Sequence, residues 1–209
     1  EKLGVTIKRI KLDEKIPQQE LMVKIWECNE NEEIRGIIVQ LPLPMGIDQD
    51  AVIEAISPQK DVDGLTSSNV KLWLAGREAG VIPATTRGVK ELLEYYKIDL
   101  FGKHVVVIGR SMLVGKPLAA YSLNQNASVT VCHSKTPDLA TETKKADILM
   151  VAAGLPKLIG ADYVREGTVV IDVGINTVKG EKLEDEISGR KLVGDVDFEA
   201  VKNIASAIT

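Results

Sequence analysis

Short runs of β-branched residues alternate with longer helix-like runs along most of this sequence, and this alternation limits the folds that the chain can adopt. The runs that we expect to form strands in its second half are 104–109, 128–132, 148–152, 169–173 and 191–193. The runs that we expect to form helices around them are 87–96, 115–124, 139–146 and 198–206. Alternation of this kind is typical of an α/β domain, in which helices cover a parallel sheet.

The first half of the chain shows a less regular form of the same pattern. The elements that we expect there are strands at 6–12 and 35–40 and helices at 18–29 and 48–56. A turn-rich stretch at residues 80–86 then separates the two halves. The sequence therefore predicts two α/β domains, residues 1–85 and residues 86–209, and we expect both ends of the chain to cut through a domain.

Charge and composition exclude several classes of function. With a formal net charge of −4 and 4% aromatic residues, the chain lacks the basic surface and the stacking platforms typical of nucleic-acid binding. No apolar run reaches the roughly 18 residues that a membrane-spanning helix needs. Two cysteines, Cys28 and Cys132, and two histidines are too few for a disulfide framework or a usual zinc site. We therefore expect a cytoplasmic protein that binds no nucleic acid, no membrane and no metal.

A glycine turn joins the expected strand at 104–109 to the expected helix at 115–124. Gly109, Arg110 and Ser111 end the strand, and Gly115 and Pro117 open the helix. Backbone N–H groups in such a turn, together with the positive end of the helix, can bind a pyrophosphate. The Gly-x-Ser-x-x-x-Gly spacing is looser than the usual Gly-x-Gly-x-x-Gly, so the pattern alone fits either a dinucleotide site or a plain strand–turn–helix. A ligand site here would make the second domain a Rossmann-type domain with a parallel sheet.

The end of the next expected strand indicates which dinucleotide would bind. Proteins that bind NAD usually carry an acidic residue there, which holds the ribose hydroxyls. This chain has Cys132-His133-Ser134-Lys135 instead, so no carboxylate repels a ribose phosphate. Arg110, Ser134 and Lys135 could bind that phosphate, which favours NADP over NAD. For His133, cofactor contact and a plain role at the start of the helix both remain open.

Two segments of the first half place polar groups beside turns. Gln40 ends the expected strand at 35–40 and is followed by Leu41 and Pro42. It fits a site residue or a plain solvent-exposed strand end. Asp61 and Asp63 lie in a glycine turn, which could be a solvated turn, a cation site or a substrate anchor. A carboxylate in a cleft can accept paired hydrogen bonds from the ring N–H and exocyclic amine of a pterin.

Six segments in a fixed order resemble one family. They are VQLPLP at 39–44, KDVDG at 60–64, GRSMLVGKP at 109–117, CHSKT at 132–136, VIDVGIN at 170–176 and GDVDF at 194–198. Together they resemble the bifunctional methylenetetrahydrofolate dehydrogenase/cyclohydrolase family, from about Gly4 to Thr209. The resemblance implies a catalytic domain and a Rossmann domain, usually in a homodimer. It also implies NADP-dependent oxidation of methylenetetrahydrofolate, often followed by hydrolysis of the product to the formyl form.

The resemblance also assigns roles to individual residues. Gln40 matches a glutamine that assists the catalytic lysine, and Asp63 matches an aspartate that anchors the pterin; with Leu41 and Pro42 they form the expected substrate site. The residues that match cofactor contacts are Gly109, Arg110, Ser111, Gly115, Pro117, His133, Ser134, Gly154 and Ile175. Within that set, Arg110, Ser111 and Ser134 match contacts to phosphate and ribose. Ile175 matches a backbone position near the nicotinamide, and Gly154 matches a loop that lines the same groove.

The chain departs from the family pattern in three places. We expect the helix with the catalytic lysine to precede Glu1 and the family's glycine-rich loop to follow Thr209, so this chain alone should hydrolyse little methenyl product. Ala84 stands where the family commonly has cysteine, which argues against an essential thiol. Two other readings remain: a Rossmann dehydrogenase for amino or hydroxy acids, and a non-catalytic NADP-binding homologue or dimerisation module. Gln40 and Asp63 argue against the second, because a scaffold needs neither.

Overall fold

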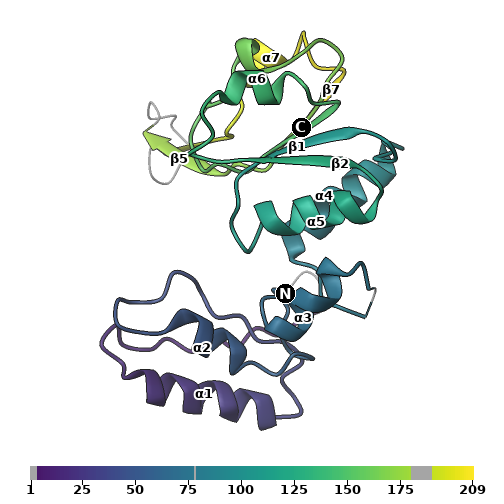
Figure 1. The fold of residues 1–209 in the computed structure, drawn as a ribbon. Coiled ribbons are helices and arrows are strands. Elements are labelled where there is room, and N and C mark those ends of the chain that lie inside the picture. The colour runs from purple at the N-terminus through teal and green to yellow at the C-terminus, as the bar shows by residue number, and fades with distance from the viewer. Residues whose placement is uncertain (1–3, 78, 180–189) are drawn as a thin grey trace. The chain divides into compact units, whose positions relative to one another are not determined.

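The computed structural model describes residues 4–77, 79–179 and 190–209, and it divides into two compact units. The first unit comprises residues 1–62 and the second residues 63–209 (Figure 1).

The second unit is built on a five-stranded parallel sheet. Its strands are β1 (His104–Ile108), β2 (Ser128–Cys132), β3 (Ile148–Val151), β4 (Val169–Asp172) and β7 (Ala207–Ile208). They lie in the order β2-β1-β3-β4-β7, and every neighbouring pair is parallel. The helices of this unit are α3 (Ser67–Leu74), α4 (Ala84–Tyr95), α5 (Gly115–Asn124), α6 (Leu139–Thr143), the short 3-10 helix Ala161–Tyr163 and α7 (Phe198–Val201). The α/β prediction is confirmed.

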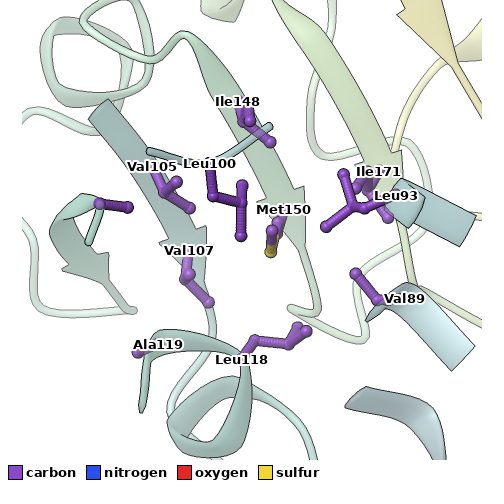
Figure 2. Packing of buried hydrophobic residues seen from close by; sticks show 11 residues of the cluster. Val89, Leu93, Leu100, Val105, Val107, Leu118, Ala119, Ile148, Met150 and Ile171 are labelled. Carbon is purple, nitrogen blue, oxygen red and sulfur yellow. The ribbon is translucent and has the colours of Figure 1, made fainter. Parts of the chain in front are cut away.

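Both faces of the parallel sheet are buried under helices. Helices α4 and α5 lie on one face and α6 and α7 on the other (Figure 1). Because successive side chains of a strand point to opposite faces, Val105 and Val107 face the α4–α5 side, whereas Val106 and Ile108 face the other. Figure 2 shows Val105 and Val107 with Leu93 of α4 and Leu118 of α5 in the first of these cores. Strands buried on both faces explain why these runs are almost entirely apolar.

The first unit contains helices α1 (Gln18–Glu30) and α2 (Gln49–Glu54). Leu21 and Ile25 of α1 are buried with Val52 of α2 and Ile56 in a small separate core. Asp48 begins α2 by accepting hydrogen bonds from the backbone N–H groups of residues 50 and 51 through its side chain. A single parallel bridge pairs Ile37 with Asp61, and the Ile37 N–H donates to the Lys60 carbonyl oxygen at 2.6 Å.

Several predicted elements were wrong. Residues 6–12 form no strand, and of residues 35–40 only Ile37 is bridged. An extended segment becomes a strand only where a run of backbone groups is paired, and no such run occurs here. The strand predicted at residues 191–193 is present as part of β6 (Arg190–Val193), but it pairs antiparallel with β5 (Asn176–Lys179) outside the main sheet. The last helix ends at Val201 instead of residue 206.

Candidate active site

The glycine turn after β1 has no room for side chains at either glycine. Gly109 has a φ of 116°, and a Cβ on it would overlap the Ala152 carbonyl oxygen. A Cβ on Gly115 would overlap the carbonyl oxygen of Gly109, because α5 starts directly against the turn. A backbone without side chains is what a pyrophosphate requires for close approach to the N–H groups. The turn therefore fits a dinucleotide.

Ser111 and Pro117 shape the first turn of α5. Ser111 Oγ accepts hydrogen bonds from the N–H groups of Val114 at 3.2 Å and Gly115 at 3.4 Å. Pro117 is buried in that first turn, where its missing N–H leaves no hydrogen bond unmade. Both residues thus hold the start of α5, whose positive end faces the glycine turn. Arg110 lies between them and β1 and is exposed.

The end of β2 lies beside the glycine turn. Cys132 pairs with Ile108, and its carbonyl oxygen accepts a hydrogen bond from the Gly109 N–H at 2.9 Å. Arg110 and Ser134 each follow this pair by two residues, so the sheet brings them to the same edge, and both are exposed. Ser134 also stands in a turn free of acidic residues, as expected for a site that accepts a ribose phosphate.

The His133 ring has a local partner. Its Nδ1 accepts a hydrogen bond from the Lys135 N–H at 3.1 Å, and the His133 N–H donates to Thr136 Oγ1 at 2.9 Å. The ring is half-buried and helps to close the turn that presents Ser134. Neighbouring Cys132 is buried, and burial raises the pKa of its thiol, with a smaller contribution from Glu142. A buried thiol with a raised pKa is a poor nucleophile.

Gly154 and Ile175 lie at the same carboxyl edge, after β3 and β4 respectively. Both are exposed, and Gly154 has a φ of 67°, a conformation that favours glycine. The loop of Gly154 is held by the side chain of Asp195, to whose Oδ2 the Gly154 N–H donates at 2.9 Å. Sequence reasoning gave Asp195 no role, although its GDVDF segment was among the six that carried the resemblance.

The expected substrate residues are split between the two units. Gln40, Leu41 and Pro42 lie in the first unit, where Gln40 is exposed and its side-chain amide donates to the Leu41 carbonyl oxygen at 3.1 Å. The peptide bond between Leu41 and Pro42 is cis. Asp63 is half-buried and opens the second unit.

The turn that carries Asp63 is held in place by its glycine. Gly64 has a φ of 68°, and a Cβ on it would overlap the Val81 carbonyl oxygen. Its own carbonyl oxygen accepts a hydrogen bond from Trp73 Nε1 at 3.0 Å. Asn69, also on α3, accepts a hydrogen bond from the Val81 N–H at 3.1 Å through its side chain. Helix α3, which the sequence did not predict, therefore supports this turn.

The described part of the chain holds neither a cluster of metal ligands nor a membrane-spanning helix. Within residues 4–77, 79–179 and 190–209, no three His, Cys, Asp or Glu side chains gather as metal ligands. Among the helices in those ranges, none is long and apolar enough to cross a lipid bilayer.

Comparison with known families decides what this architecture is. Residues 1–63 match the catalytic domain of the tetrahydrofolate dehydrogenase/cyclohydrolase family, and residues 83–209 match its NAD(P)-binding domain. The chain belongs to this family. A relative named Bifunctional protein FolD from Bacillus cytotoxicus is 47% identical over 209 residues, which are the whole of this chain and 70% of the relative.

Solved structures of family members have the same fold. The bifunctional FolD enzyme from Campylobacter jejuni is 46% identical with a TM-score of 0.86, over 95% of this chain and 67% of that one. The Trypanosoma brucei enzyme, solved with NADP cofactor and an inhibitor, is 38% identical with a TM-score of 0.86, over 94% of this chain and 66% of that one. The resemblance inferred from six short segments is thus confirmed.

Proposed function

We propose that the protein oxidises 5,10-methylenetetrahydrofolate to 5,10-methenyltetrahydrofolate with NADP as the hydride acceptor. In the complete enzyme the product is then hydrolysed to 10-formyltetrahydrofolate, which serves one-carbon metabolism and purine biosynthesis. Membership of the family supports the reaction. The main structural support for NADP as the hydride acceptor is the turn at Gly109 and Gly115, which has no room for side chains. It lies beside the end of β2, where no carboxylate stands.

The chain's residues suit the binding of NADP. The N–H groups at the start of α5 would hold the pyrophosphate, and Arg110 and Ser134 would hold the ribose phosphate. NADP supplies the hydride acceptor when it is bound. The donor carbon lies between two amine nitrogens, so the cation that forms is stabilised by resonance. The protein therefore has mainly to orient the two reactants and to exclude water.

The substrate would be held by residues of the KDVDG turn and the QLPLP segment. Asp63 would accept hydrogen bonds from the pterin ring, and its half-buried position on a turn anchored by Trp73 makes it a well-placed acceptor. Gln40, with Leu41 and Pro42, would assist the lysine-dependent steps. The hydrolytic step depends on that lysine most.

We assign residues 1–85 to the catalytic domain and residues 86–209 to the NADP-binding domain. The two family matches, which end at residue 63 and begin at residue 83, support a connection between them. Helix α3 in this connection contacts α5, since the Asn124 side chain donates to the Trp73 carbonyl oxygen at 3.1 Å. We also infer a cytoplasmic homodimer, as in the family that the sequence resembles.

Turnover with methylenetetrahydrofolate tests the proposal. A chain extended at both ends to the length of its relatives should reduce NADP, followed by NADPH absorbance, and should reduce NAD more slowly. Asp63→Ala should lose turnover and keep NADP binding, while Asp162→Ala, an exposed acid on the 3-10 helix, should change neither. NADP binding without any turnover in the unsubstituted protein would favour a non-catalytic homologue instead.

A further inference from the structure

The Asp195 carboxylate is fully buried and accepts four hydrogen bonds. Its Oδ2 accepts from the N–H groups of Ala153 at 2.6 Å and Gly154 at 2.9 Å. Its Oδ1 accepts from the Leu155 N–H at 2.9 Å and from Asn176 Nδ2 at 2.7 Å. One side chain thus joins three consecutive amides after β3 to the residue that begins β5.

A second carboxylate holds Asp195 in place. Asp172, at the end of β4, accepts hydrogen bonds from the N–H groups of Asp195 at 3.0 Å and Val196 at 2.9 Å. Two glycines make room for the pair, because a Cβ on Gly174 would overlap the Asp195 carboxyl group and a Cβ on Gly194 that of Asp172. Burying a carboxylate is costly unless both of its oxygens accept hydrogen bonds, and for Asp195 three backbone N–H groups and the Asn176 side chain supply the donors.

The topology places this network under one half of a bound dinucleotide. In a doubly wound sheet the ligand crosses the carboxyl edge at the point where the strand order reverses. That point lies between β1 and β3, because β2 follows on one side of β1 and β3 on the other. The adenosine half would then lie over β1 and β2, on the side of Arg110 and Ser134. The other half would lie over the loops after β3 and β4, which contain Gly154 and Ile175.

Resting on the proposed NADP-linked activity, we propose that Asp195 is a positioning residue for the nicotinamide half of the cofactor. It fixes the position of residues 153–155 by accepting hydrogen bonds from their backbone N–H groups. It fixes the position of Ile175 through the hydrogen bond from the adjacent Asn176. Asp195 does not reach the surface edge that a cofactor would touch, since it is 0% exposed. Its effect therefore passes through the loops that it holds.

A carboxylate is needed at position 195 because both of its oxygens must accept hydrogen bonds. In Asp195→Asn one oxygen becomes an NH2 group that faces N–H donors, so at least one loop amide loses its acceptor. The loop must then be ordered when the cofactor binds, which weakens the affinity. The loss should fall on ligands that carry nicotinamide and should spare ligands that carry only the adenosine half.

Calorimetric titration with two ligands tests the proposal. Asp195→Asn should weaken the binding of NADP by about tenfold. The affinity for adenosine 2′,5′-bisphosphate, the phosphorylated adenosine half, should stay within about twofold of that of the unsubstituted protein. Amide hydrogen exchange should show faster exchange at residues 153–155. Asp147→Asn is the matched control, because Asp147 accepts a backbone hydrogen bond from His104 at the opposite, amino end of the strands. It should leave both affinities unchanged.

The outcomes separate this proposal from the one on which it rests. Equal weakening of both ligands, or unchanged NADP affinity together with faster exchange, would overturn the positioning role. Failure of the unsubstituted protein to bind NADP would overturn the proposed function itself. If Asp195→Asn does not fold, Asn176→Ala replaces it, because it removes a single hydrogen bond to Asp195. It should give a smaller loss that is again confined to NADP, and a loss shared by both ligands would count against the proposal.

Discussion

The Nζ of Lys60 lies 2.5 Å from the carbonyl oxygen of Asn29, at the carboxyl end of α1. It also donates to the carbonyl oxygens of Cys28 at 3.1 Å and Asn31 at 2.8 Å. The last carbonyl groups of a helix have no hydrogen-bond donor within the helix, and they carry the negative partial charge of its carboxyl end. A lysine at this position supplies both a donor and a positive charge. The lysine of the KDVDG turn, one residue before Asp61 and three before Asp63, therefore fastens that turn to α1.

Lys60→Met should destabilise the first unit by about 1–2 kcal/mol, because it removes a charged donor from three carbonyl groups at the end of α1. Within the described residues, only that of Asn31 keeps another hydrogen bond, from the Ile34 N–H. Urea unfolding followed by circular dichroism measures the change. Lys24→Met is the control, since Lys24 forms an exposed ion pair with Glu27 on the same helix, worth about 0.5 kcal/mol or less. Equal effects of the two substitutions would contradict the capping role of Lys60.

Arg110→Ala should weaken the binding of NADP by about tenfold and change the affinity for NAD little. Only NADP carries the ribose phosphate that the guanidinium would bind. Binding of each cofactor is measured by calorimetry. Lys103→Ala removes an exposed cation at the amino end of β1 and should leave both affinities unchanged. An equal loss of NADP and NAD in Arg110→Ala would remove the argument for NADP preference.

Gly115→Ala should abolish tight cofactor binding and destabilise the fold by about 1–3 kcal/mol, because its Cβ would overlap the Gly109 carbonyl oxygen in the backbone of the turn. The matched control is Gly88→Ala, in the middle of α4, where a Cβ would have nothing within 4 Å. That substitution should stabilise the protein by about 0.5–1 kcal/mol. Thermal unfolding and NADP titration of both variants measure the contrast, and similar behaviour of the two would refute the close approach at Gly115.

The second half of the fold could be predicted because its strands are buried on both faces. Such strands appear in the sequence as apolar runs, as in His104–Ile108 and Ile148–Val151. A run of this kind can be recognised from neighbouring residues alone. Residues 6–12 also contain β-branched residues, but strand formation depends on a partner elsewhere in the chain. The final helix was predicted too long because Ile204 and Ala205 are apolar at suitable spacing. Their side chains pack against the sheet core from a turn instead, and the Gly167 N–H donates to the Ile204 carbonyl oxygen.

The residues of the candidate site also differ in whether a short segment defines them or contacts with distant segments do. Gly109, Gly115 and Pro117 were predictable because a strand–turn–helix places its requirements within one short segment. The contacts of the Asp195 side chain were not predictable, because its backbone partners lie 40 to 42 residues earlier in the chain. Nothing in the composition of the GDVDF segment indicates that its first acid is buried and its second, Asp197, is not.

Stability at acidic pH should depend on Asp147. Its carboxylate accepts a hydrogen bond from the His104 N–H at 2.9 Å and pairs with Arg165 at 2.9 Å. The hydrogen bond from His104, followed by the contact with Arg165, lowers the pKa of Asp147 below its ordinary value of 3.8 in the folded state. A lowered folded-state pKa means that the unfolded chain takes up the proton first. The contribution is therefore complete above about pH 4 and is lost as the pH falls through the folded-state pKa.

Asp147→Asn should accordingly be less stable than the unsubstituted protein at neutral pH, and the difference in unfolding free energy should shrink as the pH falls below 3.8. Urea unfolding across that range measures it, and a carboxyl titration by NMR locates the folded-state pKa directly. Arg165→Met removes the weaker cause and should reduce the pKa shift without abolishing it, because the His104 hydrogen bond remains. A difference between Asp147→Asn and the unsubstituted protein that persisted undiminished in acid would show that the asparagine disturbs packing at the amino ends of β1 and β3, and that the charge of Asp147 contributes nothing.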